Sequence, residues 1–243
     1  MGDHAPARRG LKPVPGEAAP GDLFPPRQID TDALEAGRLL FAKECRFVAG
    51  AGNPAALPPE TLPEIAFIGR SNVGKSSLVN ALTGRRMLAR ISRTPGRTQQ
   101  INFFDLGGRL MLVDLPGYGY ATASKGAVRA WTALVERYLS TRAGLARACL
   151  LIDARRGITD TDRPTLALCD NAALSYQVVL TKIDAVKPAE LAAAAAAVAG
   201  ELARRRAAHP EIHLTSAEKR LGIAALRASL AAFAEVAPSP RSR

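Results

Sequence analysis

Residues 69–76, GRSNVGKS, have the spacing GxxxxGK[ST], which is typical of a loop that cradles phosphate groups. Glycines in such a loop let the backbone wrap a phosphate with its N–H groups, and the helix that follows adds the positive end of its dipole. Lys75 is placed to reach the β- and γ-phosphates of a nucleotide, and the Ser76 hydroxyl to ligate Mg²⁺. A glycine turn with a chance lysine is the alternative, but the apolar run before the loop and the helix-forming run after it favour a phosphate site.

A second group of chemistry-bearing residues ends another apolar run, in VDLPGYGYA at 113–121. Asp114 ends the expected strand, where a carboxylate can hold Mg²⁺ through its water shell. Gly117 lets its N–H approach a γ-phosphate. In many nucleotide hydrolases the residue after this glycine is a glutamine that positions the attacking water, and here it is Tyr118. A phenol cannot polarise water as an amide can, so we expect slow intrinsic hydrolysis.

Two further strand ends carry residues that could select a base. In TKID at 181–184, the carboxylate of Asp184 can accept hydrogen bonds from N1–H and N2–H₂ of guanine, an edge that adenine lacks, and the stem of Lys182 would lie along the purine. The usual form of this motif begins with asparagine, so Thr181 is a departure. In TSA at 215–217, small side chains would let a backbone N–H approach guanine O6.

The segment RTPGRTQQINFF at 93–104 could supply a threonine that binds Mg²⁺ only when a γ-phosphate is present. Thr94 and Thr98 both fit, and Thr98 is preferred because it lies closest to the expected strand. Arginines crowd this region, and they either belong to a solvated loop or contact RNA. They are Arg85, Arg86, Arg90, Arg93 and Arg97.

The chain around these motifs alternates between strand and helix patterns, which predicts an α/β fold with a mostly parallel sheet. Strand patterns lie at 64–69, 101–106, 109–115, 146–154, 176–184 and 211–217, and the run at 45–50 can form a short strand. Helix patterns lie at 31–44, 75–84, 127–140, 161–174, 188–208 and 224–236. Gly107-Gly108 predicts a hairpin turn. Ligands of such sheets bind at the carboxyl ends of the strands, where the motifs above fall.

The composition limits the class of protein. The formal net charge of +11 and the pI of about 10.2 favour a polyanionic partner, although a GC-rich genome, which encodes arginine often, would give the same balance. Three cysteines without CxxC spacing indicate reduced core thiols, and no run suits a membrane span or a signal peptide, so we expect a soluble cytoplasmic protein. Residues 1–28 predict a disordered basic proline-rich tail, 29–62 an extension packed on the domain, 63–236 the domain itself and 237–243 a basic tail.

Taken together, GRSNVGKSSLVNALTG, RTPGRTQQINFF, DLPGYGYA, LTKID and TSA resemble the EngB (YihA/YsxC) family of bacterial GTPases over roughly residues 40–235. GYGYA after DLP and the threonine of TKxD are features of that family. The resemblance implies a Ras-like P-loop GTPase, a three-layer α/β/α fold with a six-stranded mostly parallel sheet and one antiparallel edge strand. It also implies Mg²⁺-dependent binding of GTP and GDP, slow GTP hydrolysis, and a role in large ribosomal subunit assembly and in normal cell division and septation.

The resemblance also assigns roles to residues by motif. It implies catalytic roles for Lys75, Thr98 and Gly117, and Mg²⁺ ligation by Ser76 and Thr98. The implied nucleotide contacts are Gly69, Arg70, Ser71, Asn72, Val73, Gly74, Lys75, Ser76, Gly96, Arg97, Thr98, Gln99, Gln100, Asp114, Leu115, Pro116, Gly117, Thr181, Lys182, Ile183, Asp184, Leu214, Thr215 and Ser216. In related GTPases with a hydrophobic residue at the glutamine position, an asparagine equivalent to Asn72 helps to hold K⁺, so K⁺ activation is a further hypothesis.

Two rival functions remain open at this point. The first is a division protein that contacts septal proteins directly, without RNA. The second is a P-loop kinase, which TKID and TSA disfavour because they predict guanine recognition. The surface pattern shows no apolar stripe, and we expect a monomer that binds the large ribosomal subunit and its rRNA.

Overall fold

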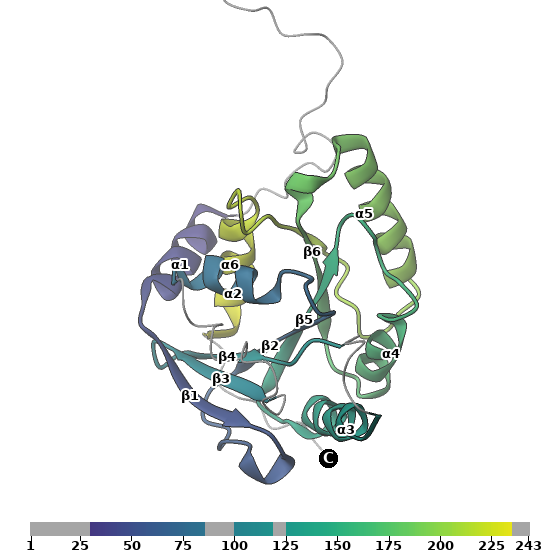
Figure 1. Ribbon diagram of the computed structural model, residues 1–243. Helices are drawn as coiled ribbons and strands as arrows, with labels where there is room; N and C mark the ends of the chain where they lie inside the picture. Colours follow the sequence, from purple (N-terminus) through teal and green to yellow (C-terminus); the bar gives the residue numbers. More distant parts are fainter. Residues whose placement is uncertain (1–29, 86–99, 119–124, 235–243) are drawn as a thin grey trace, which may run out of the picture.

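The computed structural model describes residues 30–85, 100–118 and 125–234. One sheet of seven strands, in the order β1-β3-β4-β2-β5-β6-β7, runs through the molecule (Figure 1). The strands are β1 (Cys45–Ala51), β2 (Glu64–Gly69), β3 (Ile101–Leu106), β4 (Leu110–Asp114), β5 (Leu145–Asp153), β6 (Tyr176–Thr181) and β7 (His213–Leu214). The predicted fold class is confirmed. The pairs β4–β2, β2–β5, β5–β6 and β6–β7 are parallel, and β3 is antiparallel to both of its neighbours, β1 and β4.

The sheet differs from the expected one in its number of strands. The run at 45–50, noted as a candidate short strand, forms β1 and pairs antiparallel with β3, in a register that places Phe47 opposite Phe104. The sheet therefore has seven strands instead of six, and the antiparallel strand β3 lies one place in from the edge. Phe47 also stacks edge-on against Phe104, with ring centroids 5.7 Å apart, which helps to hold the added strand.

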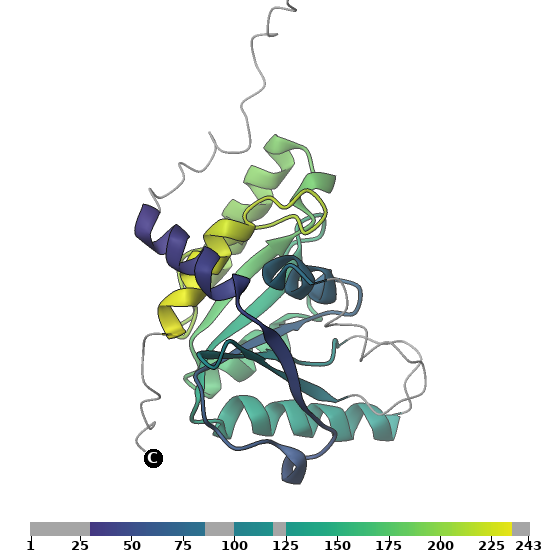
Figure 2. The same ribbon diagram turned by 90° about the vertical axis from the view of Figure 1, so that its left-hand side faces the viewer.

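Helices cover both faces of the sheet, as Figures 1 and 2 show. The α-helices are α1 (Thr31–Ala42), α2 (Lys75–Thr83), α3 (Lys125–Thr141), α4 (Arg163–Asn171), α5 (Pro188–Leu202) and α6 (Ile223–Ala231), with short 3₁₀ turns η1 (Pro54–Ala56), η3 (Ile183–Ala185) and η4 (Ala232–Ala234). Buried side chains of α1, α2 and α6 form one core cluster with the sheet, and those of α3, α4 and α5 form another. These are the three layers that the family resemblance implies.

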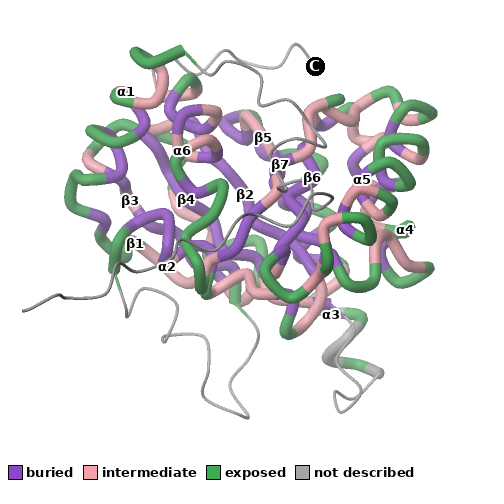
Figure 3. The backbone as a smooth tube through the Cα atoms, turned by 90° about the horizontal axis from the view of Figure 1, so that it is seen from above, coloured by how far each residue is buried: buried purple, intermediate pink, exposed green. Residues whose placement is uncertain are grey.

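The central strands have the burial that parallel sheets require. Every residue of β2 and of β4 is buried, because helices cover both faces there, and Figure 3 shows this buried centre with exposed positions on the outer helices. The turn between β3 and β4 has positive φ at Gly107 and Gly108, 61° and 65°, as a type I′ hairpin demands. These two glycines therefore help to set the hairpin register, in which Asp114 faces Asn102.

The amino end of the sheet holds a buried ion pair. Glu64 begins β2, and its carboxylate accepts hydrogen bonds from Nε and Nη2 of Arg142 at 3.0 and 2.7 Å. The Tyr138 hydroxyl donates to the same carboxylate at 2.9 Å, and Nη1 of Arg142 lies 3.8 Å from Oε1 of Glu60. Burial and the nearby Glu64 raise the pKa of Tyr138 well above its ordinary value, so this hydroxyl keeps its proton and donates.

The N-terminal helix α1 packs against α6 at very short range. A Cβ added to Gly37 would lie 2.6 Å from the Ala228 amide nitrogen, so only glycine permits this approach. Across the same face, Arg227 of α6 donates to the carbonyls of Leu82 and Ala81 at 2.8 and 3.2 Å, which satisfies the C-terminal end of α2. α1 and α6 therefore brace the helix that begins at the phosphate loop.

Three further expectations concern the terminal tails, the cysteines and membrane-spanning helices. The predicted tails at 1–28 and 237–243 lie outside it. Cys45, Cys149 and Cys169 are buried free thiols, as predicted. Among the described residues, no helix combines the length and the apolar character that a membrane crossing needs.

Candidate nucleotide-binding site

The predicted phosphate loop connects the end of β2 to the start of α2. Its backbone turns through the left-handed region at Asn72, with φ 63°, and at Gly74, with φ 103°. Gly69 passes so close to β5 that an added Cβ would lie 2.9 Å from the Leu151 carbonyl oxygen. Gly74 therefore permits a left-handed turn of the loop, and Gly69 permits close packing against β5. α2 begins at Lys75, so its first amides face the loop.

The end of β4 meets this loop from the neighbouring strand. Lys75 Nζ forms an ion pair with the carboxylate of Asp114, and both side chains are largely buried. Gly117 lies against the loop, since a Cβ there would come within 3.1 Å of the Ser71 nitrogen. The hydroxyl of Ser76 and the carboxylate of Asp114 are hard oxygen donors, the type that Mg²⁺ prefers, so the residues present fit the predicted metal.

The TKID loop, which is predicted to select the base, is tied to the phosphate loop by Lys182. Its Nζ donates to the Asn72 carbonyl at 2.6 Å and to Oδ2 of Asp153 at 3.0 Å. Burial favours the neutral form of Asp153, but hydrogen bonds from Arg155 and Lys182 outweigh it and hold the pKa of this carboxyl far below its ordinary value. Asp153 is therefore an anion that fixes the position of the Lys182 side chain.

Thr181 makes a second tie between the same two loops. Its hydroxyl oxygen lies 2.6 Å from the Val73 carbonyl and 3.2 Å from the Ile152 carbonyl, and the residue is buried. A hydroxyl has a single proton to donate, so the shorter contact, to the phosphate loop, is the stronger hydrogen bond. The threonine that departs from the usual asparagine thus still connects the base loop to the phosphate loop.

The loop after β7 uses two of the three amides of the TSA motif within the fold. Thr215 donates both its amide and its hydroxyl to the Leu180 carbonyl, at 2.7 and 3.0 Å, and the Ser216 amide donates to the Leu221 carbonyl at 3.1 Å. Both amides are therefore engaged within the fold. Ala217 is the next residue of the motif, and its amide is the better candidate for guanine O6.

The structure gathers most of the predicted residues at the carboxyl edge of the sheet. Ile183 N–H donates to the Thr215 carbonyl at 3.3 Å and so joins the two base loops, and Asp184 beside it is exposed. The gathered residues are Gly69, Arg70, Ser71, Asn72, Val73, Gly74, Lys75, Ser76, Asp114, Leu115, Pro116, Gly117, Thr181, Lys182, Ile183, Asp184, Leu214, Thr215 and Ser216.

The first-switch residues are the exception. Gly96, Arg97, Thr98 and Gln99 lie outside the described residues, so the predicted second Mg²⁺ ligand, Thr98, stays a prediction. Gln100 is described, and its side-chain oxygen would lie 2.6 Å from a Cβ at Gly50 of β1. Its side chain thus rests on the edge strand β1, which β3 and β4 separate from β2.

Tyr118 does not point toward the phosphate loop. Its side chain is buried in the core cluster of α3, α4 and α5, and its hydroxyl donates to Oδ1 of Asp162 at 2.7 Å. Sequence reasoning missed Asp162, which lies 44 residues further along the chain and carries no motif. It also missed Asp153, for which a signal existed, because this aspartate ends an apolar strand just as Asp114 does.

An α/β sheet with a GxxxxGK[ST] loop between β2 and α2, and with the TKID and TSA motifs after β6 and β7, defines a P-loop nucleotide-binding protein. A family model described as "50S ribosome-binding GTPase" matches residues 64–182. The "Probable GTP-binding protein EngB" of Rhodospirillum rubrum is 53% identical over 226 residues, covering 91% of this chain and 98% of its own. The protein of the same name from Hyphomonas neptunium is 54% identical over 210 residues, covering 85% and 96%. The chain belongs to the EngB family of GTP-binding proteins.

Solved structures agree on the fold. The crystal structure of a probable GTP-binding protein EngB covers 70% of this chain and 98% of its own, with a TM-score of 0.56 at 21% identity. Era in complex with MgGDPNP and nucleotides 1506–1542 of 16S ribosomal RNA covers 76% of this chain and 60% of its own, with a TM-score of 0.55 at 18% identity. At these identities the likeness concerns the arrangement of strands and helices alone.

Proposed function

We propose that this protein is a Mg²⁺-dependent GTP switch with slow GTPase activity, which acts in the cytoplasm in assembly of the large ribosomal subunit and supports normal cell division and septation. The observation that carries the GTPase part is the joining of the phosphate loop to both the DxxG loop and the base loop, through Lys75, Thr181 and Lys182. The net charge of +11 and the ribosome-binding description of the matching family model support the ribosomal part.

Each residue at the carboxyl edge has a task in this proposal. Lys75 exchanges its partner Asp114 for the β- and γ-phosphates, and the Gly117 amide donates to the γ-phosphate. Asp184 accepts from the guanine edge, and the Lys182 stem carries the ring. Mg²⁺, held by Ser76, by Thr98 and, through water, by Asp114, would neutralise the phosphate charge.

The slow rate follows from the direction of Tyr118. Its hydroxyl is bound to Asp162 in the core, so no side chain at this position positions water. Transition-state charge must then be met by Lys75, the metal and backbone donors, or by groups from a partner. Activation by K⁺ beside Asn72 stays a prediction, which a comparison of turnover in K⁺ and Na⁺ buffers tests.

Co-sedimentation with large ribosomal subunits tests the ribosomal part. The protein carries a non-hydrolysable GTP analogue, GDP or no nucleotide, at two salt concentrations, and an adenine analogue serves as the control for base selection. We expect binding with the GTP analogue alone, weakening steeply at higher salt because lysine and arginine contacts to phosphates release counterions.

The other results separate the rival functions. Guanine nucleotide binding without subunit binding in any state would keep the GTPase and remove the ribosome, and septal proteins would become the partners to test. Equal binding of adenine and guanine analogues would remove the guanine switch itself and favour a kinase-like protein.

A further inference from the structure

Tyr118 occupies the position after the DxxG glycine, yet it behaves as a core residue. It is 7% exposed, and its hydroxyl donates to Oδ1 of Asp162 at 2.7 Å. Burial raises the pKa of Tyr118 far above its ordinary value, and the neighbouring Asp162 adds to this, so the hydroxyl keeps its proton and donates. The side chain of the residue that follows Gly117 is thus fixed at both its ring and its tip.

The acceptor is itself held in place. Asp162 is 1% exposed and precedes α4, and its second oxygen accepts from the amide and the hydroxyl of Thr159, at 2.8 and 2.6 Å. A carboxylate with three donors in a buried turn has little freedom to move. Nη1 of Arg70 in the phosphate loop also reaches the Thr159 hydroxyl, at 3.5 Å, so this turn contacts both loops.

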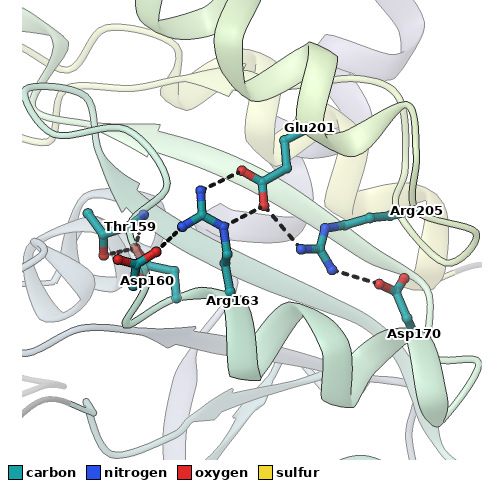
Figure 4. A network of polar contacts seen from close by, with 7 residues as sticks. Thr159, Asp160, Arg163, Asp170, Glu201 and Arg205 are labelled. Carbon is teal, nitrogen blue, oxygen red and sulfur yellow. Dashed lines mark hydrogen bonds and ion pairs between the residues drawn. The ribbon is translucent and has the colours of Figure 1, made fainter.

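The start of α4 is braced against α5, as Figure 4 shows. Arg163, the residue after Asp162, pairs with Asp160 and lies 3.4 Å from Glu201 of α5. Glu201 also accepts from Arg205 at 3.0 Å, and Arg205 reaches Asp170 at the far end of α4. The turn that holds Asp162 is therefore attached to two helices.

The main chain of Tyr118 transmits this anchoring to the phosphate loop. Its N–H donates to the Gly69 carbonyl at 3.2 Å, and its carbonyl accepts from the Ser71 amide at 2.9 Å and the Ser71 hydroxyl at 3.2 Å. Gly117, one residue earlier, lies against Ser71 so closely that an added Cβ would be 3.1 Å from the Ser71 nitrogen. Where Tyr118 rests therefore determines where the Gly117 amide lies.

We propose that Tyr118 is a positioning residue, which through its hydrogen bond to Asp162 fixes the Gly117 amide for the γ-phosphate and so sets the preference for GTP over GDP. The inference rests on the proposed GTP switch. GDP has no γ-phosphate and does not need the Gly117 amide, so loss of the hydrogen bond affects the two nucleotides unequally. Other GTPases use the residue at this position to place water. In this protein the residue at the same position places a backbone donor, the Gly117 amide.

The test compares three buried tyrosines by tyrosine-to-phenylalanine substitution. Tyr118→Phe keeps the ring and removes the bond to Asp162. Tyr138→Phe removes a similar bond, to Glu64, at the opposite end of the sheet. Tyr176→Phe removes a buried hydroxyl that has no hydrogen-bond partner within the described residues. Titration calorimetry measures the affinity of each folded protein for GDP and for a non-hydrolysable GTP analogue with Mg²⁺.

We expect Tyr118→Phe to lose about tenfold in affinity for the GTP analogue, the size of one hydrogen bond to a charged group, and less than about twofold for GDP. Tyr138→Phe and Tyr176→Phe keep the wild-type ratio of the two affinities, whatever they do to stability. An equal loss for both nucleotides in Tyr118→Phe, or no change in the ratio, overturns the proposal. Failure of the wild-type protein to bind GDP would instead overturn the proposed function.

Asp162→Asn tests the same bond from its other end. It lowers the strength of the acceptor for the Tyr118 hydroxyl and is expected to reduce the ratio of the two affinities in the same direction. A thermal unfolding scan shows whether each variant is folded at the temperature of the titration. An unchanged ratio in a folded Asp162→Asn protein also counts against the proposal.

Discussion

The two ends of the sheet each hold a buried ion pair, and the pairs are built differently. At the amino end, the Glu64 carboxylate accepts from two nitrogens of Arg142 and from the Tyr138 hydroxyl. At the carboxyl end, Lys75 pairs within the described residues with one carboxylate, that of Asp114, between two loops. Groups of the fold fill the hydrogen-bonding capacity of the Glu64 carboxylate. Among the described residues, the Lys75 ammonium keeps N–H donors and the Asp114 carboxylate keeps lone pairs that other groups can use.

Unfavourable backbone conformations are also concentrated at the carboxyl end of the sheet. Within the described residues, four non-glycine residues have positive φ, and three of them, Asn72, Lys182 and Arg220, lie in loops at the carboxyl edge. Such conformations cost free energy and persist only where the surroundings impose them. The comparison shows one end built for stability and the other holding strained loops and an exchangeable pair where ligand chemistry is proposed.

The largest effect is expected from Arg142→Ala. It leaves the Glu64 carboxylate buried without its cation, which costs about 3–5 kcal/mol of the free energy of unfolding. Urea denaturation measures this loss, and Arg38→Ala, which breaks an exposed pair with Glu35, is the control without a measurable effect. The GDP affinity of the folded Arg142→Ala protein stays at the wild-type value. A loss below about 1 kcal/mol would show that the amino-end network does not stabilise the fold in the way described.

A smaller free-energy change, in binding rather than in folding, is expected from Lys75→Ala. Loss of the cation that would meet the β- and γ-phosphates lowers GTP affinity by about a hundredfold, since hydrogen bonds to charged groups contribute the most. Lys43→Ala removes an exposed lysine at the end of α1 and controls for net charge. If Lys75→Ala bound GTP within about threefold of the wild-type affinity, the carboxyl-end pair would be structural, like that of Arg142 and Glu64.

Local pattern accounts for most of the fold. Apolar runs such as 64–69 and the glycine pair at 107–108 act within a few residues, so strands, helices and the hairpin could be predicted. The edge strand β1 was harder, because its exposed Phe47 and its bulge after this residue give no clean alternation. The pairing of β1 with β3 joins residues 50 or more positions apart, which a local periodicity cannot predict.

The site divides in the same way. Lys75, Asp114 and Asp184 could be found because each motif carries its chemistry in consecutive residues at a strand end. The sequence shows that Tyr118 is unusual at this position. Its pairing with Asp162 could not be predicted, because it depends on how α4 packs in the tertiary structure. The hydrogen bond from the Ser216 amide to the Leu221 carbonyl likewise depends on the turn between these residues, and the TSA motif alone does not predict it.

The smallest effect should arise at neither ion pair but at His213 in β7, the last strand. Burial lowers the pKa of His213 below its ordinary value, with Arg147 and His209 acting in the same direction against Glu211. The unfolded chain therefore binds this proton more readily, and stability is lost as the pH falls below about 6.5, with a slope of at most about 1.4 kcal/mol per pH unit. Urea denaturation at pH 7.5 and 5.5 measures the loss, and His213→Leu should reduce it. If the wild-type protein and His213→Leu lost equal stability between the two pH values, groups other than His213 would cause the loss. The ionisable groups at each end of the sheet would then have to be titrated separately.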